Sequence, residues 1–169
     1  MARIDYLDEN TASERTRDVL EKNGHKNIFR MLAHSESHFV NYCRLGNAIR
    51  FKGALDPQLR ELAITRAGIL CHSDYEVVAH KRLGRAAGIT EPKIEALEQG
   101  AGADAYTAEE NAVLRFTDEV VQNDRVSDES FNSVAEFLSP EALVELHLAV
   151  GFYIMTSKFL VTFDIDMQT

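Results

Sequence analysis

Residues 61–80 read ELAITRAGILCHSDYEVVAH, and this stretch organises the rest of the chain. It combines the end of one helix, a tight connection and the start of a second helix. Asp56 followed by Pro57 is the cap-then-proline signature of a helix start, and it stands directly before the first of these helices. The sequence therefore predicts a central antiparallel helix pair over residues 57–71 and 73–88, with Val77, Val78, Leu83 and Ala86 on the buried side of the second helix.

The remainder of the sequence also follows the spacing of α-helices. Apolar residues recur three and four positions apart between residues 27 and 50, which fits one kinked helix or two helices that meet near His34. Thr107 and Ser139 are capping residues ahead of two further runs of this kind. No two alternating runs flank a hairpin turn, so no strand is expected. We predict an all-α fold, a compact bundle of seven or eight helices.

The run that follows Pro140 predicts the longest apolar helix, which extends to about Phe163. Its residues are apolar nearly all round, a pattern typical of a helix at the centre of a core or at a subunit interface. The longest apolar candidate, residues 146–155, has about half of the 20 or so residues that a membrane helix needs. No membrane partner is therefore expected.

The composition limits the classes of function. The length of 169 residues suits a single domain over residues 1–169. A net charge of −9 and a pI of about 5.1 disfavour binding to nucleic acid or to an anionic membrane, because like charges repel. Two cysteines, Cys43 and Cys71, are too few for a disulfide scaffold, and the N-terminus lacks a signal-peptide pattern. A cytoplasmic protein with reduced thiols is expected.

Glu61, Glu76 and His80 form the candidate catalytic group. Glu76 and His80 are four residues apart, so they lie on one face of a helix. Glu61 joins them if the two predicted helices pack antiparallel. Two carboxylates beside one imidazole form a proton relay, in which the ring exchanges a proton near neutral pH and an acid balances the charge. Tyr75 and Ser73 are candidates to bind an oxygen atom of a substrate.

A purely structural role for the same residues remains open. Ser73 and Glu76 also fit the S-x-x-E capping box, in which the glutamate accepts a hydrogen bond from the serine backbone N–H. Glu76 and His80 also resemble an ordinary pair on a solvated helix face. The stripe that continues through Leu83 and Ala87 is partly apolar, which favours a position beside the core.

Other histidines and motifs give weaker signals. Glu61, Glu76 and His80 include only one imidazole, and no HExxH motif occurs, so no metal site is expected. His34 and His38 lack a third ligand and are interpreted as a polar helix face. His147 lies on the apolar helix and is interpreted as a core or interface histidine. No phosphate loop or serine-hydrolase elbow is present.

The central stretch resembles the carboxymuconolactone decarboxylase family, which includes the alkylhydroperoxidase-D-like proteins. The family pattern is a glutamate, a Cys-x-x-Cys that begins twelve residues later, and a histidine four residues after the second cysteine. Glu61 and His80 match its glutamate and histidine, whereas Ser73 and Glu76 replace its two cysteines. Three later stretches are also similar: RLGRAAGIT, TAEENAVLRFTDEVV and the closing ALVELHLAVGFYIMTSKFLVTFDI. The resemblance implies a family core over about residues 40–125.

The missing cysteines matter for the chemistry that this resemblance implies. Thiol peroxidases of the alkylhydroperoxidase-D-like branch use both cysteines, and serine or glutamate cannot form a sulfenate or a disulfide. Cys71 stands two residues before the first expected cysteine, and no cysteine follows it. It is either a reactive thiol with its pKa lowered by His72 or His80, or a buried structural residue. YEVVAH is more similar to the Y-E-x-x-x-H form of the non-thiol members.

The resemblance therefore implies an enzyme of the decarboxylase type, without cofactor, that acts on a small organic acid or lactone. In this hypothesis His80 transfers the proton, Glu76 orients it, Glu61 completes the relay, and Tyr75 and Ser73 bind substrate oxygen.

Two alternatives remain open. One is an antioxidant peroxidase or disulfide reductase that uses Cys71, and the other is a non-catalytic oligomeric binding module. The resemblance also implies a homo-oligomer, either a trimer or a hexamer.

Overall fold

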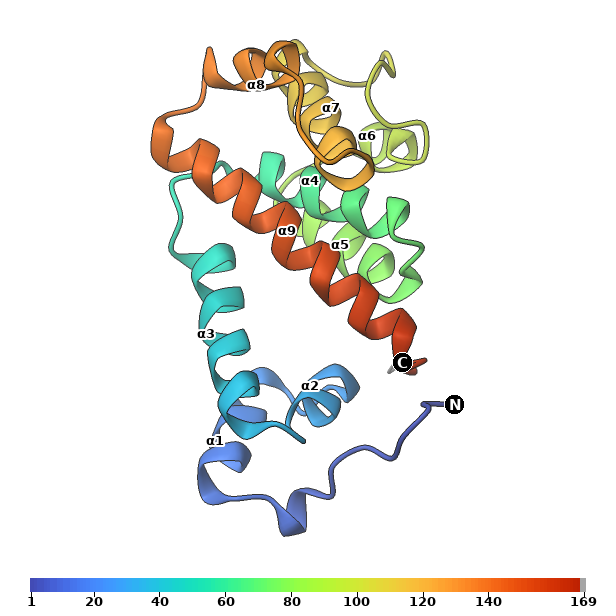
Figure 1. Cartoon of the computed structure of the whole chain (residues 1–169). Helices are drawn as coiled ribbons and strands as arrows, with labels where there is room; N and C mark the ends of the chain where they lie inside the picture. The colour runs from blue at the N-terminus through green and yellow to red at the C-terminus, as the bar shows by residue number, and fades with distance from the viewer. Residues whose placement is uncertain (168–169) are drawn as a thin grey trace. The chain divides into compact units, whose positions relative to one another are not determined.

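The computed structural model describes residues 1–167, and all regular elements in this part of the chain are helices (Figure 1). The all-α prediction is confirmed. The elements are η1 (Glu9–Thr11), α1 (Glu14–Asn23), α2 (Asn27–Leu32), α3 (Glu36–Phe51), α4 (Pro57–Leu70), α5 (Asp74–Ala86), α6 (Glu91–Ala96), α7 (Ala108–Gln122), α8 (Asp128–Ala135) and α9 (Pro140–Thr162). The described part thus holds nine α-helices, one or two more than expected.

The chain forms two compact units, residues 1–52 with the segment from 159 onward, and residues 53–158. The expectation of a single domain stays a prediction. In the first unit, Leu20, Phe39 and Cys43 belong to the cluster that α1 and α3 bury. The predicted kink near His34 is a break between two helices, α2 and α3, so the two-helix alternative is correct.

In the second unit, α4 is the most deeply buried helix. Its start follows the predicted signature, because the Asp56 side chain accepts hydrogen bonds from the backbone N–H groups of Gln58 and Leu59, with Pro57 in the first turn. All residues from Glu61 to Gly68 are buried. α4, rather than the C-terminal helix, therefore forms the centre of this unit.

Two glycines allow α4 and α5 to approach closely. A Cβ atom placed on Gly68 would lie 3.3 Å from Cβ of Glu76, and one on Gly84 would lie 3.8 Å from Cβ of Glu61. The start of α4 therefore lies against the end of α5, and the end of α4 lies against the start of α5. This is antiparallel packing. The predicted central pair is confirmed, and its helices bring Glu61 and Glu76 to the same interface.

The buried face of α5 is polar, unlike the apolar face that the sequence predicted. Val78 is 54% exposed and Ala86 is exposed, whereas Glu76, His80 and Gly84 are buried. The expectation of Val78 and Ala86 as core residues is wrong. The prediction relied on the helical spacing of these apolar residues. The side of α5 that is buried instead carries the charged cluster of Glu76 and His80.

α9 supplies residues 140–158 to the second unit, where Ala142, Leu146 and Val150 join its main core cluster. α9 is long and apolar enough to cross a membrane by length and composition alone, and it exceeds the apolar run that the sequence suggested. Core helices of soluble proteins satisfy the same criterion, and 44% of its most apolar 18-residue window is buried. The helix therefore combines a core-facing side with an exposed one.

Candidate functional site

His80 lies between two carboxylates in the interior of the second unit. Its Nδ1 is 2.6 Å from Oε2 of Glu61, and its Nε2 is 3.2 Å from Oε2 of Glu76. His80, Glu61 and Glu76 are 4%, 3% and 5% exposed. The structure thus brings together the three residues that the sequence grouped, in a site nearly closed to water.

The helices position these side chains differently. Glu61 lies on α4 and also contacts Arg60, whose Nε is 3.3 Å from Oε1 of the glutamate. Glu76 lies on α5, one turn before His80, so its carboxylate and the imidazole share a helix face. Glu61 is therefore held from two sides, whereas the contact at Nε2 of His80 is longer and made within one helix.

Tyr153 completes the enclosure of the imidazole. Its ring centroid is 4.6 Å from that of His80, with an interplanar angle of 78°, an edge-to-face contact. Tyr153 belongs to α9 and is 6% exposed. Sequence reasoning missed this residue, because its only signal was a tyrosine among apolar side chains of the last helix.

The two acids change the proton affinity of His80. Burial lowers the pKa of His80, but hydrogen bonds and charge interactions with Glu61 and Glu76 outweigh it, so the pKa is raised above its ordinary value. Burial raises the pKa of Glu61, but His80 and Arg60 outweigh it, so this pKa is lowered. The protonated imidazole is therefore stabilised near neutral pH.

Ser73 offers a buried hydroxyl at the N-cap of α5. The residue is 2% exposed, and its Oγ has no hydrogen-bond partner within residues 1–167. Its backbone N–H donates to the carbonyl of Gly68 at 3.0 Å, and its side chain makes no capping bond. The predicted capping box is therefore not formed. Ser73 has non-helical backbone angles, with a φ of −106° and a ψ of 87°, and stands three residues before Glu76.

A cavity of about 690 Å³ lies at the turn between α4 and α5. Ser73 lines it together with the apolar side chains of Ile69, Leu70 and Val77. His72 also lines it and has a φ of 56°, a left-handed backbone conformation that non-glycine residues rarely adopt. The unpartnered hydroxyl thus belongs to a residue that lines this cavity, whereas Glu61, Glu76 and His80 do not line it.

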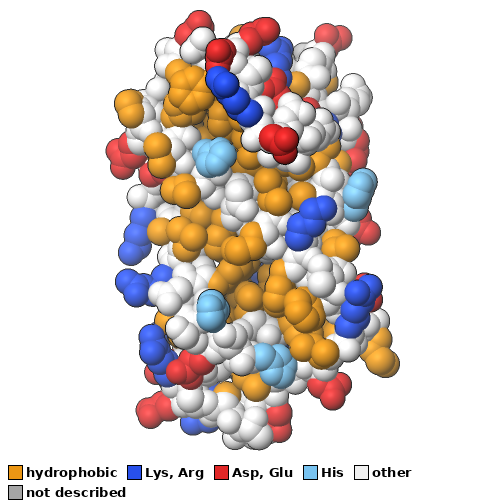
Figure 2. All heavy atoms as spheres, in the orientation of Figure 1, with side chains coloured by type: hydrophobic (Ala, Val, Ile, Leu, Met, Phe, Trp, Pro, Cys, Tyr) orange, Lys and Arg blue, Asp and Glu red, His pale blue; other side chains and the backbone are white. Residues whose placement is uncertain are grey.

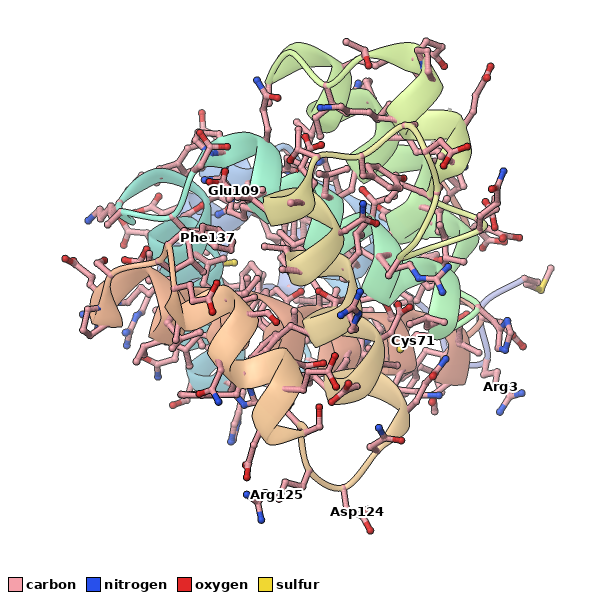
Figure 3. All side chains as sticks on the ribbon, turned by 90° about the horizontal axis from the view of Figure 1, so that it is seen from above. Arg3, Cys71, Glu109, Asp124, Arg125 and Phe137 are labelled. Carbon is pink, nitrogen blue, oxygen red and sulfur yellow. The ribbon has the colours of Figure 1, made fainter. Side chains whose placement is uncertain are left out.

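The other two residues predicted for the site lie apart from this face. Tyr75 is half-buried and, being one residue from Glu76, points to a different side of α5. Cys71 ends α4 and is 3% exposed; burial raises its pKa, and the charge of Lys158 offsets this only in part. Figure 3 shows Cys71 among the packed ribbons, unlike Arg125 at an outer loop. Cys71 therefore lacks the low pKa of a reactive thiol.

His34, His38 and His147 lie outside the site. His34 is in the turn between α2 and α3 and His38 is on α3, so the predicted shared helix face is wrong, although both residues are exposed and contact polar groups. His147 is also exposed, with its ring 6.3 Å from that of Phe116, so it is not a core residue, and its place at an interface stays a prediction. Among residues 1–167, no three His, Cys, Asp or Glu side chains are grouped as a metal site would require.

No curated protein matches this sequence. Solved structures do match its fold. A peroxidase-related protein from Ralstonia eutropha JMP134, described as an alkylhydroperoxidase AhpD core, aligns with a TM-score of 0.85 and 19% identity over 99% of this chain and 92% of its own. The debrominase Bmp8, as a variant in complex with 2,3,4-tribromopyrrole, aligns with a TM-score of 0.81 and 15% identity over 100% and 95%.

A third structure, a putative antioxidant defence protein AhpD from Agrobacterium tumefaciens, aligns with a TM-score of 0.75 and 22% identity over 80% of this chain and 94% of its own. These likenesses establish a shared helical fold. The sequence model of the carboxymuconolactone decarboxylase family matches residues 39–119, which include Glu61, Ser73, Glu76 and His80. The resemblance that the sequence suggested is therefore confirmed: residues 39–119 match the carboxymuconolactone decarboxylase family.

Proposed function

We propose that this protein is a carboxymuconolactone decarboxylase-like enzyme in which His80 transfers a proton to a small organic acid or lactone. One observation carries the proposal. The imidazole of His80 is held between the carboxylates of Glu61 and Glu76 in a site nearly closed to water. Such an arrangement favours a positioned acid–base group over a merely structural pair.

The two contacts of His80 suggest different roles for the two acids. Glu61, at 2.6 Å from Nδ1, fixes the orientation of the ring and balances its charge. Glu76, at 3.2 Å from Nε2, makes the longer contact, which a substrate displaces more readily. Nε2 is therefore the nitrogen that exchanges a proton with the substrate, and Glu76 accepts or returns that proton.

For a decarboxylation, the proton balance is simple. The bond between a carbon atom and its carboxylate breaks, carbon dioxide leaves, and the electron pair stays on the carbon. That carbon then takes up one proton. The raised pKa of His80 supports a protonated ring near neutral pH, so His80 is the donor, and solvent returns the proton after the product leaves.

The substrate is proposed to enter through the cavity at the α4–α5 turn and to accept a hydrogen bond from the Ser73 hydroxyl. Ser73 lines that cavity with an unpartnered hydroxyl and stands at the N-cap of the helix that carries Glu76 and His80. Tyr75, on another side of the same turn, is the weaker candidate for contact with substrate. The debrominase of similar fold, in its complex with a tribrominated pyrrole, supports a small ring as the kind of molecule.

Release of carbon dioxide from carboxymuconolactone tests the proposal. The expected result is turnover by the unmodified protein, loss of turnover in His80→Gln, and full turnover in His38→Gln, a matched change at an exposed histidine. Retained turnover in His80→Gln, with circular dichroism confirming a folded protein, rules out the role of His80.

A peroxidase or disulfide reductase centred on Cys71 is the second candidate, and two neighbours of similar fold, an antioxidant defence protein and a peroxidase-related protein, support it. The raised pKa and burial of Cys71 speak against it. Peroxide consumption that survives Cys71→Ser eliminates this candidate. An apolar environment around His80 would favour a non-catalytic binding module. Two carboxylates contact the ring instead, which speaks against this alternative.

A further inference from the structure

One stripe of exposed residues follows the outer side of α9 within the second unit. It consists of Glu141, Val144, Leu148, Gly151, Met155 and Lys158, all exposed. Their spacing alternates between three and four residues, the pattern that keeps one face of a helix against a partner helix. The middle of the stripe is apolar, with Val144, Leu148 and Met155 at 59%, 46% and 51% exposure. Figure 2 shows hydrophobic side chains gathered along the course of α9.

Gly151 lies at the centre of this stripe and has no structural explanation within the described residues. A Cβ atom placed on it would meet no other atom within 4 Å. A glycine inside a helix is unfavourable for helix stability, and close packing usually accounts for one, as it does for Gly68 and Gly84 of the central pair. The missing side chain therefore leaves room for a group from outside the chain.

We propose that α9 packs antiparallel against α9 of a second copy, about a two-fold axis between Leu148 and Gly151. In this register Leu148 fills the space above Gly151 of the partner subunit, and Val144 meets Met155 of the partner subunit. The stripe is then complementary to itself, as a two-fold interface requires. The pairs are Glu141 with Lys158, Val144 with Met155 and Leu148 with Gly151, so each residue of the stripe faces another residue of the stripe.

The charges at the two ends select the antiparallel direction. Glu141 pairs with Lys158 of the partner subunit, and the two-fold axis forms this pair twice. Neither residue has an ion-pair partner within residues 1–167. A parallel arrangement sets glutamate against glutamate and lysine against lysine, which repel each other.

An apolar groove widens the surface on one side of the stripe. It has a volume of about 740 Å³ and is lined by residues of α7, α8 and α9, among them Phe116, Phe131, Leu143 and Val144. Met155 of the partner subunit, opposite Val144, lies at the mouth of this groove. Methionine is unbranched and adapts to irregular spaces, so it suits this position.

The proposal concerns an interface and is independent of the reaction proposed above. It predicts an assembly with an even number of subunits, because each α9 pair joins two copies.

Molar mass by light scattering, with the full-length protein, tests the interface. The expected result is a dimer or a multiple of a dimer for the unmodified chain, and at least tenfold weaker association for Gly151→Leu, with unchanged helical circular dichroism. Lys158→Glu should also weaken association, and the double variant Glu141→Lys/Lys158→Glu should restore it. A monomer at every concentration, or an assembly that neither substitution affects, overturns the proposal.

Cysteine cross-linking tests the register and remains informative if Gly151→Leu does not fold. A mixture of Val144→Cys and Met155→Cys proteins should form a disulfide-linked heterodimer, whereas Val144→Cys alone should not. In the proposed register two copies of residue 144 are offset by 11 residues, or about 16 Å along the helix. Both natural cysteines are buried, which keeps the background low. Efficient self-linking of Val144→Cys indicates a parallel contact and overturns the proposal.

Discussion

Nδ1 of His80 lies 2.6 Å from Oε2 of Glu61, so a residue of α5 is oriented by a residue of α4 that precedes it by 19 positions. The contact joins the two helices at the point where their glycines let them approach. Both residues are buried, so the protonation and orientation of the His80 ring depend on how α4 and α5 pack, and this packing depends on the His80 charge.

The first prediction concerns the pH dependence of stability. The pKa of folded His80 lies above its ordinary value of 6.5, so its contribution is complete below 6.5 and is lost as pH rises through the folded pKa. The pKa of folded Glu61 lies below 4.5, so its contribution is complete above 4.5 and is lost as pH falls through that lower value. The free energy of unfolding should be greatest between these values in urea titrations.

The matched variant for this test is His80→Gln. Removing the imidazole leaves two buried acids without their partner, which should lower the free energy of unfolding by about 3–5 kcal/mol. The decline of stability above pH 6.5 should be absent from this variant. A decline of equal size in both proteins assigns the pH dependence to other groups.

A second prediction separates the two acids. Glu76→Gln should reduce kcat by about 100-fold or more, because Glu76 contacts the nitrogen proposed to exchange the proton. Glu61→Gln should lower both the stability and the His80 pKa, because the shorter hydrogen bond to a carboxylate is lost. Chemical denaturation and an NMR titration of the ring measure these effects. Equal changes in both variants contradict the proposed division of roles.

A third prediction tests the close approach of the central helices. In Gly68→Ala, the new Cβ lies 3.3 Å from Cβ of Glu76 and forces the helices apart. The expected loss of stability is about 1–3 kcal/mol from strain, reduced by up to ~1 kcal/mol of gained helix propensity. Turnover should fall as well. Arg82→Ala, at an exposed position of α5, is the control and should leave stability and turnover nearly unchanged.

Ser73→Ala provides a fourth test, in which stability and binding should respond differently. The hydroxyl has no partner within residues 1–167, so its removal should leave the free energy of unfolding unchanged or slightly raised. KM should increase by about 2- to 10-fold if the hydroxyl binds substrate. Ser133→Ala, at a hydroxyl that bonds a helix carbonyl, is the control and should not change KM.

The fifth prediction concerns the thiols. Burial raises the pKa of Cys43 to about 12 and also raises that of Cys71, so neither should form a thiolate near neutral pH. Both should react slowly with iodoacetamide in the native protein and rapidly in denaturant, as followed by mass spectrometry. Rapid alkylation of native Cys71 restores the peroxidase candidate.

The sequence predicted a helix start well where that start depends on residues close together in the chain. Thr107 forms its capping box with Glu110, and α7 covers the residues that this signature indicated. α9 likewise begins at Pro140, directly after the predicted capping residue Ser139. The signature at Ser73 was misleading, because the tight turn commits its backbone N–H to the carbonyl of Gly68. A motif of four residues does not reveal this competing acceptor.

The candidate site was predictable only in part. The spacing of Glu76 and His80, together with an antiparallel neighbour, was sufficient to group Glu61 with them. The contact of Tyr153 with His80 depends on how α9 packs, and no local pattern encodes it. The partly apolar stripe through Leu83 and Ala87 favoured a position of Glu76 and His80 beside the core, and both are buried. The apolar periodicity also placed Val78 inside, although it is exposed.

In the family pattern that the sequence resembles, Ser73 and Glu76 stand at the positions of the Cys-x-x-Cys pair and His80 stands at the position of the histidine. The close approach of α4 and α5 depends on Gly68 and Gly84. Residues 73 and 76 can therefore differ between proteins of this architecture without a new arrangement of the helix pair.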